Sequence, residues 1–124
     1  INVYFWWGFM RFKVIIAMVE KDHQEDVIAA AKSAGATGVT ILNARGEGLH
    51  EHKSFFGLQM EQQRDALLFI VEDFHANEIL DSIYKAGDFH EKGHGIAFSW
   101  SVDRVVGTES QMRVLEGKAE KKYI

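Results

Sequence analysis

The 124-residue sequence contains neither cysteine nor proline. Without thiols the chain has no disulfide, no thiolate nucleophile and no cysteine metal ligand, and a cytoplasmic location is expected. Without proline, no helix or strand is interrupted by a residue that lacks a backbone N–H. Long apolar runs are missing as well, since none reaches the roughly 18 residues of a membrane-spanning helix. We therefore expect a protein that is not embedded in a membrane.

Positive charge is also scarce. Lysine and arginine number 14 against 18 acids, which gives a net charge of −4. The sequence has no basic stripe of the kind that binds nucleic acid. It also lacks a P-loop, a G-x-S-x-G motif and a cysteine nucleophile. The hydrophobic fraction of 47% and the charged fraction of 26% are those of a globular domain. Together these features predict a single-domain protein that is not an enzyme and does not bind nucleic acid.

The chain divides into three parts. Residues 1–9 are aromatic and uncharged, and the NVYF stretch resembles the remains of a protease site from a purification tag. We interpret them as a non-native extension, because a secretory signal would need a basic region and a cleavage site. Residues 10–112 form the expected domain. Residues 113–124 form a C-terminal tail that becomes mostly charged and is expected to fray.

Hydrophobic patterning predicts four strands and two helices. The strands are expected at Phe12–Val19, Gly38–Ala44, Asp65–Glu72 and Gly95–Val106; one helix runs from an N-cap at Asp22 to Gly35, the other from Asn77 to Gly87. Residues 19–35 align without gaps on residues 71–87 with five identities in 17 positions, although two amphipathic helices could match by chance. Two βαβ units in this order predict an α+β, ferredoxin-like sandwich, a four-stranded antiparallel sheet with both helices on one face.

Two of the predicted strands are apolar on both faces. Phe12–Val19 has apolar residues at alternate positions on each side, and Asp65–Glu72 has the same character. The helices can cover only one face of the sheet, so the second face needs another cover. Further copies of the same chain are the most economical cover, and they predict a closed homo-oligomer.

Two glycine-rich segments are candidates for binding a small anion or a nucleotide. Glycines let backbone N–H groups approach a phosphate closely, and each segment also carries a cation. The candidate ligand-binding residues are Arg45, Gly46 and Gly48 in the first segment, and Gly87, Asp88, Lys92, Gly93 and Gly95 in the second. Tight turns would explain the glycines of the first segment without any ligand, and that alternative stays open.

Histidine is abundant, with six residues in the chain, and four of them lie in the same two segments. His50 and His52 form a His-x-His pair, whose rings point to one side of an extended segment, as a divalent transition metal requires. His90 and His94 lie in the second segment. One interpretation is a metal site made of all four residues, and the other is that they are ordinary polar surface residues.

Taken together, these segments resemble the PII signalling proteins, the nitrogen regulatory family. The resemblance covers roughly Phe12 to Ser110, and it is carried by AGATGVT, ARGEG, the helix end KAGDF and the glycines before the last strand. It implies a homotrimer whose sheets face a central core. It also implies an adenine nucleotide in the clefts between subunits, and a transporter or an enzyme as the regulated partner.

The resemblance also implies a role for the long loop at about Glu47–Phe56, which would contact the partner. The residues concerned are Glu47, Leu49, His50, Glu51, His52 and Lys53. His50 stands where the family has a glutamine that holds a metal and a 2-oxo acid, and Lys92 is the nearest match to its phosphate-binding lysine. The alternative is a trimer that binds divalent metal through loop histidines, as in the similar CutA copper-tolerance family.

Overall fold

The computed structural model describes residues 11–44, 54–55, 58–59, 64–91 and 93–107. Its elements are β1 (Phe12–Val19), the 3-10 turn η1 (Lys21–His23), α2 (Gln24–Ser33), β2 (Thr40–Ala44), β3 (Ser54–Phe55), β4 (Leu58–Gln59), β5 (Arg64–Glu72), α3 (Asp73–Ala86) and β6 (Gly95–Val102). The predicted β-α-β-β-α-β order is present. The short antiparallel β3–β4 pair between β2 and β5 was not predicted from the sequence.

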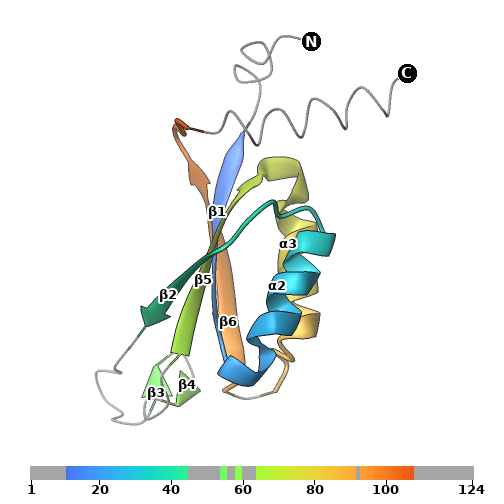
Figure 1. The fold of residues 1–124 in the computed structure, drawn as a ribbon, viewed down its shortest axis with the longest axis vertical. Helices are drawn as coiled ribbons and strands as arrows, with labels where there is room; N and C mark the ends of the chain where they lie inside the picture. Colours follow the sequence, from blue (N-terminus) through green and yellow to red (C-terminus); the bar gives the residue numbers. More distant parts are fainter. Residues whose placement is uncertain (1–10, 45–53, 56–57, 60–63, 92, 108–124) are drawn as a thin grey trace.

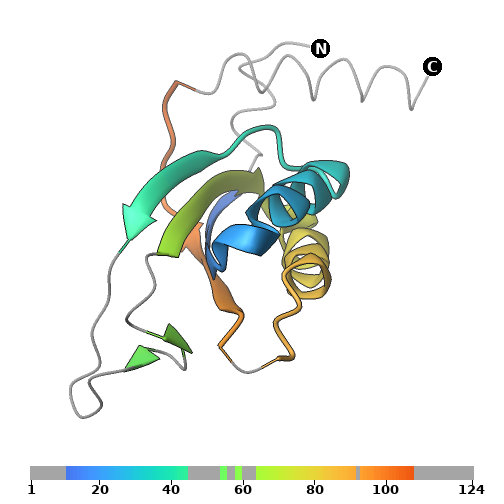
Figure 2. The same ribbon diagram turned by 60° about the horizontal axis from the view of Figure 1, so that its bottom comes forward.

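Four of the strands form one antiparallel sheet in the order β2-β5-β1-β6. Helices α2 and α3 pack side by side against one face of it (Figures 1 and 2). This arrangement confirms the predicted ferredoxin-like α+β fold. Strand β1 has the predicted bounds, β2 begins two residues later, and β6 ends at Val102 rather than Val106. No helix in the described part of the chain is long and apolar enough to cross a membrane.

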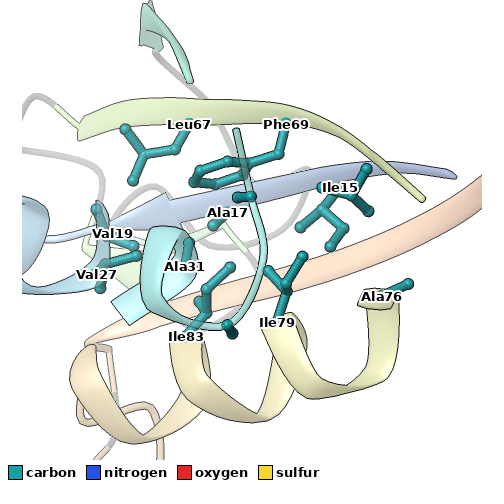
Figure 3. Packing of buried hydrophobic residues seen from close by; sticks show 13 residues of the cluster. Ile15, Ala17, Val19, Val27, Ala31, Leu67, Phe69, Ala76, Ile79 and Ile83 are labelled. Carbon is teal, nitrogen blue, oxygen red and sulfur yellow. The ribbon is translucent and has the colours of Figure 1, made fainter. Parts of the chain in front are cut away.

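The hydrophobic core lies between the sheet and the two helices (Figure 3). Successive residues of a strand point to opposite faces of the sheet, so alternate residues of β1 and β5 point into the core. Directly paired residues share a face, so the two strands contribute to the core together. The fully buried members are Ile15, Ala17 and Val19 of β1, Leu67, Phe69 and Val71 of β5, Val27 and Ala31 of α2, and Ala76, Ile79 and Ile83 of α3. The predicted apolar stripes of the helices therefore face the sheet, except that Tyr84 of α3, which was also predicted to point inward, is 50% exposed.

The opposite face of the sheet is apolar, and neither α2 nor α3 covers it (Figures 1 and 2). Ile16 pairs with Phe98, and Val14 pairs with Trp100, so these side chains share the face away from the core. Phe98 is 38% exposed and Trp100 is 47% exposed, and their rings stack with centroids 5.9 Å apart. The predicted apolar side of β6 thus faces away from α2 and α3, while Ala97 on its other side packs against the core.

Both helices begin differently from the prediction. Asp22 is not the N-cap of the first helix, because Lys21–His23 forms a 3-10 turn and α2 starts after His23 without a side-chain cap. Helix α3 begins at Asp73, four residues before the predicted Asn77. The Asp73 backbone N–H donates to the carbonyl of Arg11 (2.8 Å), which ties this helix start to the entry of β1.

Both helices end in a Schellman motif, in which a left-handed residue follows the helix and two backbone bonds close it. In α2 the left-handed position is Gly35, with φ of 127°, as predicted. In α3 it is Asp88, with φ of 56°, whereas Gly87 before it has φ of −84°. The predicted stop at Gly87 is therefore displaced by one residue, and Asp88 is held in the turn that leads to β6.

Candidate functional site

The described residues include six of the predicted site residues, which lie between the end of α3 and the first residue of β6. These are Gly87, Asp88, His90, Gly93, His94 and Gly95. The other predicted site residues, Arg45 to Lys53 and Lys92, lie outside the described residues, as do the predicted non-native extension 1–9 and tail 113–124. The geometry of the candidate site therefore comes from the α3–β6 turn and the elements that contact it.

The α3–β6 turn is held by its own backbone and by one aromatic ring. The Glu91 N–H donates to the Asp88 carbonyl (3.0 Å), and the His94 N–H donates to the Glu91 carbonyl (3.2 Å). A Cβ added to Gly87 or to Gly95 would come within 2.2 and 2.4 Å of the Phe89 ring. Two of the predicted ligand-binding glycines thus have a packing role, which is to leave room for Phe89.

Residues 90–94 read H-E-x-x-H, a motif that was wrongly taken to be absent in the prediction that the chain is not an enzyme. On a helix this spacing places two histidines on one face, where they bind zinc. Here the described residues of the segment lie in turns and bends, with Gly93 at a φ of 84°. The two histidines therefore lack the helical arrangement of a metalloprotease, and the motif does not support protease activity.

Four polar side chains from three parts of the chain meet at this end of the sheet. Glu20 follows β1, His23 lies in the 3-10 turn, Arg64 begins β5, and His94 precedes β6. The Glu20 N–H donates to the His94 carbonyl (3.3 Å), and the His23 N–H donates to the Glu20 carbonyl (3.0 Å). Figure 2 brings this end of the molecule forward and shows the start of α2 near the α3–β6 turn.

Arg64 is the most deeply buried cation among the described residues, with 6% of its surface exposed. Its Nη2 donates to the Gly93 carbonyl (2.9 Å) and lies 3.7 Å from Oε1 of Glu20. Its Nε and Nη1 atoms are buried and have no hydrogen-bond partner among the described residues. A guanidinium with unused donors can bind a carboxylate or a phosphate.

Glu20, His23 and His94 form a compact cluster in which one ligand atom from each lies within 4.8 Å of the others. Oε2 of Glu20 is 3.6 Å from Nδ1 of His23, and the two imidazole rings are 5.2 Å apart. His90, which was predicted to share a metal with His94, is instead paired with Asp88 (3.1 Å) and is more exposed. Of the four predicted metal ligands, His94 alone joins this cluster, while His50 and His52 lie outside the described residues.

Sequence reasoning missed Glu20, His23 and Arg64. A signal was present for two of them, since Glu20 and His23 are identities in the internal repeat. Arg64 had no such signal, because a single arginine at a strand start is ordinary in sequence.

The chain is similar to known proteins of one family. The family model described as Nitrogen regulatory protein P-II matches residues 12–111. Nitrogen regulatory protein P-II 2 of Methanothermobacter thermautotrophicus is 26% identical over 117 aligned residues, covering 90% of this chain and 96% of that protein. The crystal structure of a candidate PII-like signalling protein from Thermus thermophilus matches with a TM-score of 0.56 and 27% identity, covering 74% of this chain and 86% of that one. These similarities do not favour the alternative of a CutA-like metal-binding protein.

Proposed function

Because the chain belongs to the nitrogen regulatory protein P-II family, we propose that it regulates a partner protein in response to a small anionic effector. The effector class is an adenine nucleotide. The role is regulatory rather than catalytic, and a cytoplasmic location fits it. The proposal extends the family assignment to this chain's own residues at the end of the sheet where Arg64 lies.

The observation that carries the proposal is that Arg64 is buried with hydrogen-bond donors that have no partner among the described residues. Removing a polar group from water without a hydrogen bond costs about 1–3 kcal/mol, and more when the group is charged. Arg64 is buried, yet Nε and Nη1 find no hydrogen-bond partner among the described residues. An anionic effector supplies the missing acceptors and explains why an arginine is held at this place.

The α3–β6 turn supplies the neighbouring groups. Gly93 is fixed beside Arg64 by the hydrogen bond to its carbonyl, and it has a positive φ of 84°, a conformation that glycine adopts without strain. Lys92, next to it in sequence, adds a cation suited to phosphate. Arg64, Lys92 and Gly93 are therefore the residues that we expect to hold the effector.

The proposed assembly is a homotrimer that covers the apolar face of the sheet. Phe98 and Trp100 lie on that face, and large apolar patches of this kind mark interaction sites. Three sheets packed face to face would bury them and create clefts between subunits for the effector. The Glu47–Phe56 loop would then contact a transporter or an enzyme and signal whether the effector is bound. The family description links such regulation to nitrogen use.

Titration calorimetry with ATP, ADP and AMP tests the proposal. The wild-type chain is expected to bind one of these nucleotides saturably, and Arg64→Ala is expected to weaken that binding about tenfold or more, since a hydrogen bond to a charged group contributes about 1.5–3 kcal/mol. Arg64→Lys should retain part of the affinity because it keeps the charge. Arg11→Ala, which changes an exposed arginine at the other end of β1, serves as the matched control.

Two results would overturn this proposal. One is the absence of saturable binding of all three nucleotides to the wild-type protein. The other is an Arg64→Ala variant that binds as tightly as the wild type, which would assign the effector to another part of the surface.

A further inference from the structure

We propose that Glu20, His23 and His94 bind a divalent transition metal ion of the zinc class. Two imidazoles and one carboxylate are a common ligand set for such ions. The ligand atoms lie within 4.8 Å of one another and come from separate segments, so the fold itself brings them together. The site is distinct from the four-histidine site expected from the sequence, since two of its ligands were not among those residues.

The separation of Glu20 and His23 fits shared coordination better than direct bonding. Oε2 of Glu20 lies 3.6 Å from Nδ1 of His23, which is too long for a hydrogen bond. Ligands held about 2.0–2.1 Å from a tetrahedral zinc ion are about 3.4 Å apart. The two atoms therefore stand at nearly the separation that one shared ion requires.

The burial of the histidine nitrogens points the same way. Nδ1 of His23 and Nδ1 of His94 are both buried, and neither has a hydrogen-bond partner among the described residues. Three-quarters of each side chain is covered, with 27% of each exposed. Polar atoms buried without partners are uncommon, and a bound cation satisfies ring nitrogens without any donor.

Asp88 completes the surroundings of the site. Its Oδ2 lies 3.6 Å from Nδ1 of His94, and its Oδ1 is 3.1 Å from Nδ1 of His90. At 3.6 Å the contact with His94 is too long for a hydrogen bond, so Asp88 adds a negative charge beside the proposed ion rather than a bond that orients the ring. The left-handed backbone of Asp88, fixed by the end of α3, places this carboxylate next to His94.

Glu20 also separates the site from the positive charge of Arg64. Its Oε1 faces Arg64 at 3.7 Å, while its Oε2 faces His23. One carboxylate thus balances a guanidinium on one side and the ion on the other. Three protein ligands leave at least one coordination position open to water or to another ligand.

Zinc titration of the metal-free full chain, without nucleotide and with any purification tag removed, tests the proposal. One zinc ion per chain is expected. The variants His23→Ala, His94→Ala and Glu20→Gln should each lower the affinity by more than about 100-fold. Asp88→Asn removes only a neighbouring negative charge and should have a smaller effect. Cobalt(II) provides a second readout, because its visible absorption should change when His23 or His94 is replaced.

The controls separate this site from other histidines. His90→Ala and the double variant His50→Ala/His52→Ala should bind zinc like the wild type. Thermal unfolding of each variant, recorded without metal, identifies loss of structure; if His94→Ala unfolds, His23→Gln in the short 3-10 turn carries the test. The proposal is overturned if the wild type binds no zinc saturably, or if binding survives in the His23 variants and disappears with His50 and His52. Nucleotide binding is measured separately, so either proposal can fail alone.

Discussion

At the scale of single residues, Phe89 explains two glycines that the sequence had assigned to a ligand. Gly87 and Gly95 lie at the two ends of the turn, and a Cβ at either position would overlap the Phe89 ring. Gly95 is tighter still, because its Cβ would also lie 2.7 Å from the backbone carbonyl of Met18. Packing alone therefore accounts for both glycines, and their proposed contact with a ligand stays a prediction.

Gly95→Ala should lower the free energy of unfolding by about 1–3 kcal/mol, the usual range for overpacking a filled site. The backbone carbonyl of Met18 cannot move without disturbing the β1–β6 pairing, so little relief is expected. Chemical denaturation measures the change. Gly38→Ala is the matched control, since nothing lies within 4 Å of a Cβ there, and equal stability of the two variants would contradict the packing role.

At the scale of elements, the two helices share one way of ending but use different residues for it. In α2, Gly35 and Ala36 donate to the carbonyls of Lys32 and Ala31. In α3, Asp88 and Phe89 donate to those of Lys85 and Tyr84, and the rings of Tyr84 and Phe89 contact each other. The internal repeat thus describes the fold of both units, but the equivalence of Gly35 and Gly87 in sequence does not hold in the backbone.

Gly35→Ala should therefore destabilise the protein by about 1–3 kcal/mol, the cost of holding a non-glycine residue in a sparsely populated backbone region. A further loss is expected from the ring of His75, which lies 2.9 Å from the position of the added Cβ. Thermal or chemical unfolding gives the value.

Gly107→Ala separates the two causes, because Gly107 has a φ of 87° but open space around its Cβ position. A loss of stability at Gly35 no greater than at Gly107 would exclude a packing contribution from His75.

At the scale of the whole molecule, the uncovered face of the sheet has the largest consequence. The β1–β6 register places Phe98 and Trp100 beside Ile16 and Val14, on the side away from both helices. Ile70 of β5 is also exposed. A sheet with one apolar face in water is unfavourable, so the burial of this face would support the proposed trimer.

Trp100→Glu should dissociate the proposed trimer, because it places a charge at the centre of an apolar contact. Sedimentation velocity at micromolar concentration should show a trimer for the wild type and a smaller species for the variant. Phe74→Glu, on an aromatic residue of α3 that is 65% exposed, should leave the trimer intact. A monomeric wild-type protein would refute both the assembly and the clefts on which the proposed effector site depends.

Much of the fold could be read from the sequence, because its signals are local. Alternation and apolar runs located β1 without error, and they placed β5 within one residue of its start. The helix starts were less predictable. Asp22 has the residue type of an N-cap, but it lies in a 3-10 turn instead. Helix α3 begins earlier than predicted, at Asp73, whose backbone bonds to Arg11, a residue far away in the sequence.

By itself, then, the sequence determined the order of the elements, the two apolar faces and the family resemblance, since periodicity and short motifs depend on neighbours along the chain. Only the tertiary structure decided which polar side chains meet. Glu20, His23, Arg64 and His94 converge because β5 and β6 flank β1 in a particular register. That register depends on packing between segments distant in sequence, and no local pattern records the resulting distances.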